Sequence, residues 1–203
     1  MYKLEVAFIQ GSSPISKMIS KVSKALTKKD YSGSFCPSHV FLVMNDKIIF
    51  ESSTYKNAGT NDEKVLEKGT RILNVVDRAS KVKNNLIDRT VICNDLDPYL
   101  ALKFVAKASN YKYSYSSIFK FLFNGRFTRQ KKKEHTEYIC SGLVIDALRE
   151  EYFKDNKSIQ KVLKMFEGLD SNSITPLDLF LAFCKAGYNF RTCKGLLEDV
   201  SNL

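Results

Sequence analysis

Residues 138–148 read Tyr138-Ile-Cys-Ser-Gly-Leu-Val-Ile-Asp-Ala-Leu148, a cysteine followed by a largely apolar run. Val144, Ala147 and Leu148 recur at helical intervals, which predicts an amphipathic helix whose amino end falls near Cys140. A cysteine at a helix start lies near unpaired backbone N–H groups and the positive end of the helix dipole, and both favour the thiolate. Cys140 is therefore a candidate nucleophile. Packing in the core is the competing interpretation, because free cysteine is among the most buried residue types.

The composition predicts a globular protein of mixed class. The chain has 203 residues, 44% of them hydrophobic, with 14 Phe and 10 Tyr but only nine Gly and four Pro. The length suits one domain, and because there is no internal repeat or low-complexity linker, we expect residues 1–203 to form a single domain. The five cysteines form no Cys-x-x-Cys pair, and an odd number leaves at least one thiol free. We therefore expect reduced cysteines and a cytosolic setting.

No stretch of the sequence is typical of an export signal or a membrane span. The amino-terminal apolar run is interrupted by Glu5 and turns polar by Gln10, so it lacks the continuous apolar region of a signal peptide. The longest apolar clusters, such as residues 118–123, are far shorter than the roughly eighteen residues of a membrane span. We expect a soluble or peripheral protein in the cytoplasm.

The formal net charge of +10 at pH 7 favours an acidic partner. The lysines are scattered except in the basic segment 126–133, Arg126-Phe-Thr-Arg-Gln-Lys-Lys-Lys133. Neither paired Cys/His spacing nor an aromatic RNA-binding strand accompanies this charge, so nucleic-acid binding is suggested by charge alone. Contact of the segment 126–133 with anionic lipid or an acidic substrate is an equal alternative. High lysine content that serves only solubility is the simpler interpretation.

Several further stretches have the periodicity of strands and helices. Their apolar and β-branched texture predicts strands at residues 4–9, 70–76 and 89–93 and a hairpin of residues 38–44 and 48–52. Helical spacing and capping residues predict helices at residues 15–26, 95–110, 156–168 and 177–186, and the tail after Gly187 is expected to end in a weak helical piece. This mixture predicts the α+β class. Because the hairpin is apolar on both faces, we expect it to lie centrally in a sheet covered by helices.

Two polar residues, His39 and Glu51, interrupt the apolar hairpin. If the turn is the three-residue loop 45–47, residue 39 lies opposite residue 53, and Glu51 is diagonal to His39 on the same face, within reach of long side chains. A two-residue loop would place the two on opposite faces. A buried imidazole without partners would cost about 1–3 kcal/mol, so His39 requires an explanation. A core histidine that is merely hydrogen-bonded by Glu51 is one such explanation.

The other explanation for His39 is catalysis. Cysteine nucleophiles usually need an imidazole to take the thiol proton and later protonate the leaving group, and a third polar group to fix the ring tautomer. The chain has only two histidines, and His135 follows a charged run that is typical of a solvated loop. His39 is therefore the better candidate for the base.

Metal and serine chemistry have weaker support in the sequence. Cys36 and His39 stand three positions apart, but no second pair has ligand spacing, so we expect no metal site and no cofactor. A serine hydrolase has less support still, because the chain contains no Gly-x-Ser-x-Gly elbow.

The order of the catalytic cysteine and histidine along the chain differs between families of cysteine enzymes. No histidine follows Cys140, so the usual papain order, cysteine first and histidine later, is impossible with this nucleophile. Five segments carry a resemblance: Ala7-Phe-Ile-Gln-Gly-Ser12, Ser38-His-Val-Phe-Leu-Val43, Phe50-Glu-Ser52, Tyr138-Ile-Cys-Ser-Gly-Leu-Val144 and Ile174-Thr-Pro-Leu-Asp-Leu179. They resemble the circularly permuted papain-like amidases and peptidases of the NlpC superfamily, the YiiX/YaeF group. The similarity spans most of the chain, whereas residues 55–135 match little.

This resemblance implies a permuted papain-like (NlpC-type) α+β fold with a central antiparallel sheet packed by helices. It implies that Cys140 is the nucleophile, His39 the general base and acid, and Glu51 the group that orients the imidazole. Tyr138 is similar to a tyrosine that the family keeps just before its cysteine, which implies a part in stabilising the oxyanion. The backbone N–H of Cys140 would be a further donor, since helix starts supply such groups. Gly142 replaces a bulkier family residue, which predicts a wider pocket.

The implied function is that of a cysteine hydrolase, either an amidase or peptidase or an acyl-ester hydrolase or acyltransferase, that works through an acyl-enzyme intermediate. Its substrate would carry an amide or ester, as a peptide, a peptidoglycan fragment or a lipid does. The alternative from another class is a non-enzymatic basic module whose segment 126–133 docks on anionic lipid or nucleic acid. The two can coexist, because a basic rim can steer an acidic or membrane-bound substrate toward the thiol.

Overall fold

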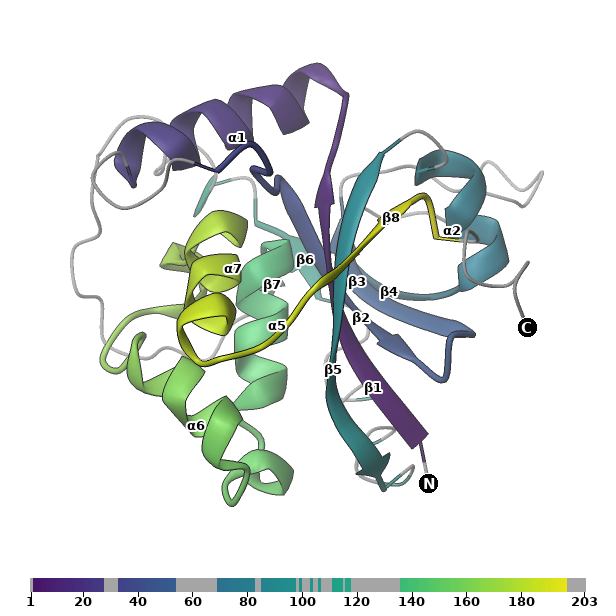
Figure 1. Cartoon of the computed structure of the whole chain (residues 1–203), viewed down its shortest axis with the longest axis vertical. Helices are drawn as coiled ribbons and strands as arrows, with labels where there is room; N and C mark the ends of the chain where they lie inside the picture. The colour runs from purple at the N-terminus through teal and green to yellow at the C-terminus, as the bar shows by residue number, and fades with distance from the viewer. Residues whose placement is uncertain are drawn as a thin grey trace.

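The computed structural model describes residues 2–27, 33–53, 69–82, 85–97, 111–114, 116–117 and 136–196, together with residues 99, 103 and 106. Over these residues the chain is an α+β protein with an eight-stranded, mostly antiparallel open sheet and five α-helices of defined bounds (Figure 1). The strand order is β7-β6-β4-β3-β2-β1-β5-β8. The α+β class and the central antiparallel sheet are thereby confirmed.

The bounds of the elements are as follows. The strands are β1 (Tyr2–Gln10), β2 (His39–Met44), β3 (Ile48–Ser53), β4 (Gly69–Asn74), β5 (Leu86–Leu96), β6 (Lys112–Tyr113), β7 (Glu137–Tyr138) and β8 (Arg191–Lys194). The α-helices are α1 (Pro14–Leu26), α2 (Val75–Val82), α5 (Cys140–Leu148), α6 (Lys157–Lys164) and α7 (Pro176–Lys185). Two short 3₁₀ turns are η1 (Glu151–Phe153) and η2 (Ser171–Ser173).

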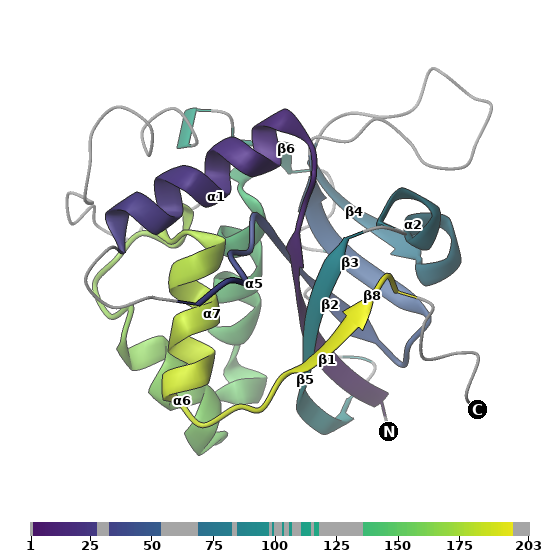
Figure 2. The ribbon, with the colours of Figure 1, turned by 45° about the horizontal axis from the view of Figure 1, so that its top comes forward.

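Helices cover the sheet on both faces (Figures 1 and 2). Successive side chains of a strand point to opposite faces, so Phe8 and Leu42 join the larger core cluster with residues of α5, α6 and α7. Ala7 and Phe41, one position away, join a smaller cluster with Val75 of α2. Strands buried on both faces become continuous apolar runs. The hairpin is therefore central in the sheet, as its sequence predicts.

The register of the hairpin is that of a three-residue turn. Leu42 pairs with Phe50 and Met44 with Ile48, which leaves residues 45–47 as the loop. This confirms the three-residue alternative of the sequence prediction. It also places His39 and Glu51 on the same face of the sheet, because both are an even number of residues from the paired positions 43 and 49.

The two hairpin strands separate at their far end. β2 continues its pairing with β1 as far as His39, whereas residues 51–53 of β3 pair with β4. The pairing between β2 and β3 ends at Leu42 and Phe50, so the hairpin forks beyond this pair. The Ser52 hydroxyl, on one side of the fork, donates to the carbonyl oxygen of Tyr138 over 2.7 Å. The fork therefore receives the segment that leads into α5.

The predicted helices at 15–26, 156–168 and 177–186 are confirmed as α1, α6 and α7, with small differences at their ends. α7 begins with a capping box in which Thr175 and Asp178 bond each other's backbone N–H. The prediction of a strand over residues 70–76 was wrong at its carboxyl end. β4 stops at Asn74, whose side chain accepts a hydrogen bond from Val76 N–H over 2.8 Å and starts α2, a helix that the sequence did not predict.

Two further predictions need correction at the edge of the sheet. β5 runs to Leu96, so Asp95 belongs to the strand, and it is Asp97 that accepts the N–H of Tyr99 over 2.8 Å at the start of the next helical residues. In the tail after Gly187, Arg191–Lys194 form β8 at the edge of β5, a strand that the sequence did not predict. The weak helical piece expected after it lies outside the described residues, as do most residues of the predicted helix 95–110.

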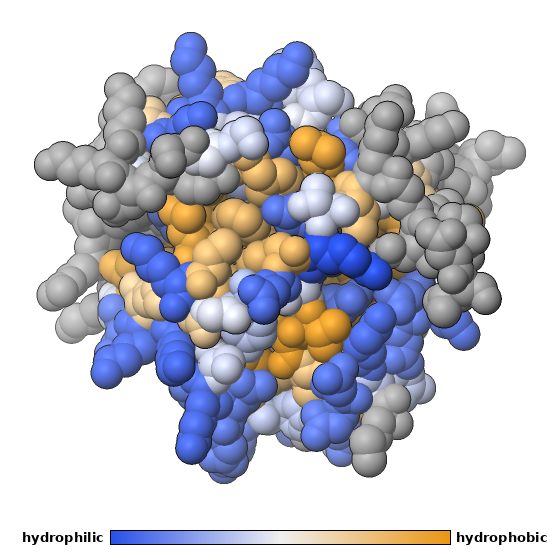
Figure 3. Space-filling view, viewed as in Figure 1, coloured by the Kyte–Doolittle hydropathy of each residue, from blue (hydrophilic) through white to orange (hydrophobic). Residues whose placement is uncertain are grey.

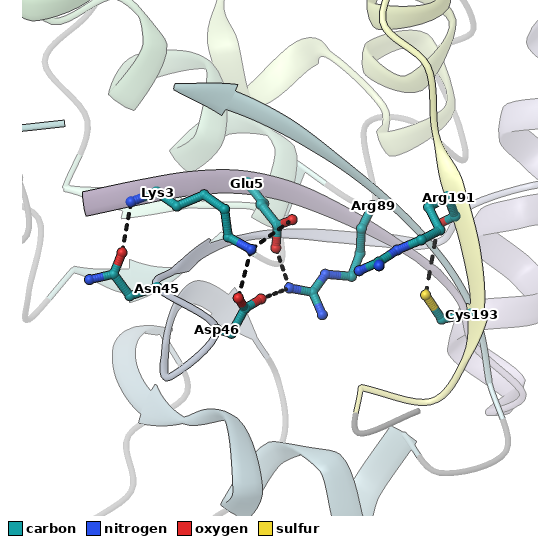
Figure 4. Close-up of polar contacts among 7 residues, drawn as sticks. All are labelled: Lys3, Glu5, Asn45, Asp46, Arg89, Arg191 and Cys193. Atoms are coloured by element: carbon teal, nitrogen blue, oxygen red, sulfur yellow. Dashed lines mark hydrogen bonds and ion pairs between the residues drawn. The ribbon is translucent and has the colours of Figure 1, made fainter. Parts of the chain in front are cut away.

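A cluster of charged residues ties β1 and β5 to the hairpin turn (Figure 4). Glu5 is buried, and its carboxylate accepts a hydrogen bond from the buried guanidinium of Arg89, which also donates to Asp46. Lys3 Nζ lies 2.6 Å from Asp46 Oδ2 and 3.6 Å from Glu5 Oε1. These four residues are called the Glu5 cluster. They balance a carboxylate that would be strongly destabilising if buried alone.

The helices with defined bounds are short. α1 is the longest of them, with 13 residues. Within the described ranges, no helix combines the length and the apolar content that a crossing of the bilayer requires.

Candidate active site

Cys140 is the first residue of α5, where the sequence predicts the helix to begin. The preceding residue, Ile139, is extended and offers no side chain to cap the first turn. Leu143, Val144 and the other apolar residues of the helix are buried against the sheet, which fixes the rotation of the helix about its axis. Cys140 is itself only 4% exposed. Its sulfur is thus set at the positive end of a buried helix.

The segment before Cys140 is fixed by hydrogen bonds from three other parts of the chain. The carbonyl oxygen of Tyr138 accepts from the Ser52 hydroxyl over 2.7 Å and from Ser114 N–H over 3.1 Å. The Asn172 carboxamide accepts from Ile139 N–H over 3.0 Å and donates to the carbonyl oxygen of Glu137 over 2.8 Å. These bonds satisfy buried backbone groups and hold the helix start in one position.

Gly142 serves this arrangement and does not widen a pocket, which corrects the prediction from the resemblance. A Cβ atom at Gly142 would lie 2.3 Å from Oδ1 of Asn172, well inside van der Waals contact. The missing side chain therefore makes room for the carboxamide that holds Ile139. Nothing in the sequence pointed to Asn172, because its partners lie more than thirty residues away, at a separation of 33 for Ile139.

His39 and Glu51 are in direct contact across the fork. His39 Nε2 lies 2.7 Å from Glu51 Oε2, and the two side chains are 13% and 0% exposed. The sequence prediction that Glu51 comes within reach of His39 is confirmed as a contact. Because Glu51 is acceptor-only when ionised, Nε2 carries the proton that it donates to the carboxylate.

The imidazole of His39 also contacts the side chain of Cys140. Burial alone would lower the pKa of His39, but the Cys140 and Glu51 side chains, which both hydrogen-bond the ring, outweigh burial and raise the pKa from 6.5 to about 9. Since Nε2 faces Glu51, Nδ1 is the ring nitrogen left for the sulfur. The structure thus brings together the three residues that the sequence singled out from opposite halves of the chain.

Two arginines, which the sequence analysis did not identify, complete the surroundings of Glu51. Arg71, directly opposite on β4, donates through Nε and Nη2 to Oε1 over 3.0 and 2.6 Å, and Arg78 of α2 donates through Nε to Oε2 over 3.2 Å. Burial alone would raise the pKa of Glu51, but Arg78, His39 and Arg71 outweigh it and hold the pKa well below its usual range. The carboxylate is therefore ionised where it meets His39.

Tyr138 is buried beside α5. Its hydroxyl is hydrogen-bonded to Asp146, and its ring centroid lies 5.3 Å from that of Tyr111. Burial and the Asp146 carboxylate raise the pKa of the Tyr138 hydroxyl well above its ordinary value. The hydroxyl is therefore beside a residue six positions after Cys140 along the helix, while the Tyr138 carbonyl takes part in fixing the helix start.

The remaining sequence predictions concern residues outside this group of side chains. His135 and the basic segment 126–133 lie outside the described residues. Cys36, considered above as a partner of His39 in a metal site, donates its Sγ hydrogen to the Ser20 carbonyl oxygen over 3.2 Å. In the part of the chain that the structure describes, no three His, Cys, Asp or Glu side chains gather closely enough to hold a metal ion.

Comparisons with protein-family models, with curated proteins and with solved structures found no match to this chain.

Proposed function

We propose that the protein is a cysteine hydrolase or acyltransferase that cleaves an amide or ester through an acyl-enzyme intermediate. One observation carries this proposal: a single imidazole, that of His39, contacts both an ionised buried carboxylate and the side chain of a cysteine at a helix start. A histidine kept only for packing needs one hydrogen-bond partner, and Glu51 would suffice. The second contact, with Cys140, is the arrangement that nucleophilic catalysis requires.

In this mechanism Cys140 attacks as a thiolate, since the adjacent imidazolium and the helix start both favour that form. Sγ forms a bond to the carbonyl carbon, and the carbonyl π electrons move to the oxygen. The tetrahedral intermediate collapses, the bond to the leaving amine or alcohol breaks, and His39 gives its proton to that group. The products of this half-reaction are a thioester on Cys140, a neutral imidazole and the free amine or alcohol.

The second half-reaction releases the acyl group. His39 takes a proton from water as the water oxygen attacks the thioester carbon, and collapse of the intermediate breaks the C–S bond. An acid is released, and Cys140 again faces an imidazolium. If an acceptor hydroxyl or amine takes the place of water, the same steps transfer the acyl group.

Glu51 acts through His39. Its carboxylate accepts the Nε2 proton and so keeps Nδ1 toward the sulfur, and it stabilises the imidazolium that forms. Arg71 and Arg78 are positioning residues that act through Glu51, because they keep its buried carboxylate ionised.

The backbone N–H of Cys140 is the oxyanion donor that the helix start supplies, because Ile139 provides no competing cap. Tyr138 fixes this start through its carbonyl group, and the oxyanion role that the resemblance implies for it stays a prediction.

A permuted papain-like fold of the NlpC type fits this function. The strands that carry His39 and Glu51 precede the cysteine helix in the chain, and the cysteine helix packs on the same sheet. The observed order of the elements is therefore consistent with the resemblance. The substrate class that follows is a peptide, peptidoglycan fragment or lipid that carries an amide or ester.

The proposal is tested by acylation with an activated aryl ester, followed by mass spectrometry of the intact protein and of its peptides. We expect one acyl group on Cys140 and none after Cys140→Ala, with an unchanged circular dichroism spectrum. Cys184→Ala is the matched control, because Cys184 is exposed and has no part in the site. Undiminished acylation of the Cys140→Ala protein, or acylation of Cys184 in preference to Cys140, would contradict the proposal.

A further inference from the structure

Helix α1 carries three rows of side chains, each with the spacing i, i+4, i+7 that lines up along a helix. The rows are Ile15, Ile19 and Val22; Ser16, Ser20 and Ser23; and Lys17, Lys21 and Lys24. Met18 lies between the apolar row and the lysine row. The rows divide the helix surface into an apolar, a hydroxylated and a cationic side.

The serine side faces the protein. Ser23 is 1% exposed, and the Ser20 hydroxyl donates to the Cys36 carbonyl oxygen over 2.7 Å. Of the apolar row, Ile19 packs against Tyr113 and Ile139. The helix is thus attached mainly through small polar residues, and its apolar side is turned partly outward.

The cationic side and part of the apolar side lie at the surface, while Ile19 and Val22 of the apolar row are half-buried. Ile15 is 49% exposed and Met18 is 39% exposed, and all three lysines of the row are exposed. In Figure 3 the upper edge, where α1 lies in the same view of Figure 1, mixes apolar and hydrophilic side chains. A surface helix of a globular protein normally turns its apolar residues to the core.

Helix α6 shows that normal arrangement with the same charges. Its lysines Lys157, Lys161 and Lys164 repeat the spacing of the α1 row and are exposed. Of its apolar residues, Ile159 and Val162 are both 0% exposed, and Leu163 is half-buried and packs against the larger core cluster. The lysine spacing is therefore ordinary, and the exposed apolar side is what distinguishes α1.

From this comparison we infer that α1 docks the protein on the surface of an anionic phospholipid bilayer. A lysine row beside exposed aliphatic side chains is the pattern of a helix that lies in the membrane interface. α1 contains no acidic residue, and the chain carries a net charge of +10, so its charge complements an anionic headgroup layer. Protein interfaces concentrate their binding energy in Trp, Tyr and Arg, none of which occurs in α1.

This inference does not depend on thiol chemistry. It has a consequence for the candidate site, because Ile19 of α1 packs against the cluster of Tyr113 and Ile139, and Ile139 precedes Cys140. A bilayer held against α1 therefore lies near the start of α5.

The inference is tested by flotation of the full chain with vesicles of phosphatidylcholine alone or of phosphatidylcholine with phosphatidylglycerol. One variant combines Lys17→Gln, Lys21→Gln and Lys24→Gln, and a second combines Ile15→Gln and Met18→Gln. The matched control combines Lys157→Gln, Lys161→Gln and Lys164→Gln, which removes the same charge from α6. Glutamine keeps helix propensity close to that of lysine, and circular dichroism checks the fold.

We expect the wild-type protein to bind the vesicles that contain phosphatidylglycerol and not those of phosphatidylcholine alone. The α1 lysine variant should bind on the order of 100-fold more weakly, since each lysine near an anionic surface contributes about 1 kcal/mol. The Ile15/Met18 variant should lose roughly tenfold or more through the lost apolar burial. The α6 variant should bind within about threefold of wild type, because its lysines lie away from the docking helix.

Three results would overturn the inference. The first is failure of the wild-type protein to bind the anionic vesicles. The second is equal weakening by the α1 and α6 lysine variants, which would show attraction by net charge alone. The third is full binding by the Ile15/Met18 variant, which would show that the apolar side does not enter the interface.

Discussion

Two of the buried carboxylates in the sheet, those of Glu51 and Glu5, are held in similar ways but have different neighbours. Both lie on the sheet face that includes Ala7 and Ile49, and each accepts hydrogen bonds from a buried arginine, Arg78 for Glu51 and Arg89 for Glu5. The Glu5 cluster is completed by a lysine and an aspartate. Glu51 instead meets an imidazole that also contacts a cysteine.

A buried carboxylate paired with arginine is by itself a structural arrangement. Both clusters compensate a desolvated charge and join strands to a neighbouring element. What distinguishes the surroundings of Glu51 is the addition of His39, a side chain that can both donate and accept a proton.

The largest effect is expected from His39→Gln, which removes the feature that the Glu5 cluster lacks. A positioned general base contributes about 10²–10⁴-fold to a rate, so we expect acylation of Cys140 to slow by about 10³-fold. The measurement is the rate of aryl-ester labelling, followed by mass spectrometry. Labelling at the wild-type rate would show that the imidazole only packs against the sulfur.

Replacing either carboxylate by an amide is expected to lower stability by a similar amount. Only the replacement of Glu51 is expected to slow labelling, and by less than His39→Gln does. Breaking one side of a buried ion pair costs about 3–5 kcal/mol, so Glu51→Gln and Glu5→Gln should lower the free energy of unfolding in urea by comparable amounts. Glu51→Gln should in addition slow labelling by on the order of 10²-fold, because the imidazole loses the group that sets its tautomer. Equal slowing by the two variants would reduce the distinction to a difference in folding.

The smallest effect is the pH dependence of stability that His39 confers. Its pKa of about 9 in the folded protein lies above its ordinary value of 6.5, so the stabilisation is complete below pH 6.5 and is lost as the pH rises through 9. At about 1.4 kcal/mol for each pKa unit, the effect is on the order of 3–4 kcal/mol. Thermal melts of wild-type and His39→Gln proteins across this range should converge as the pH rises. A difference that stays constant would argue against a protonated His39.

The sequence predicted those parts of the fold that depend on local patterns. The hairpin followed from apolar residues on both sides of a short polar loop, although the sequence left open whether two or three residues form the turn. The cysteine helix followed from its apolar stripe. The start of α7 followed from its capping residues. The contact between His39 and Glu51 could be predicted for the same reason, because one hairpin fixes both residues.

The unpredicted parts depend on contacts between distant segments. α2 is short and lies in a polar region, and the buried guanidinium of Arg78 donates to Glu51, which lies 27 residues earlier in the chain. Asn172 lies in a 3₁₀ turn without any periodic signal, yet its carboxamide holds the helix start. β8 has four residues and gains its structure from the edge of β5. Such elements are determined by tertiary packing rather than by local propensity.

The fork in the central hairpin has a consequence for biosynthesis. The segment that occupies it follows Ser52 by 86 residues, so a ribosome-bound chain exposes the hairpin long before Tyr138 has been made. During that interval the imidazole has no thiol to activate. In the proposed mechanism, acylation of Cys140 therefore has to wait until the cysteine helix has been made and has docked in the fork.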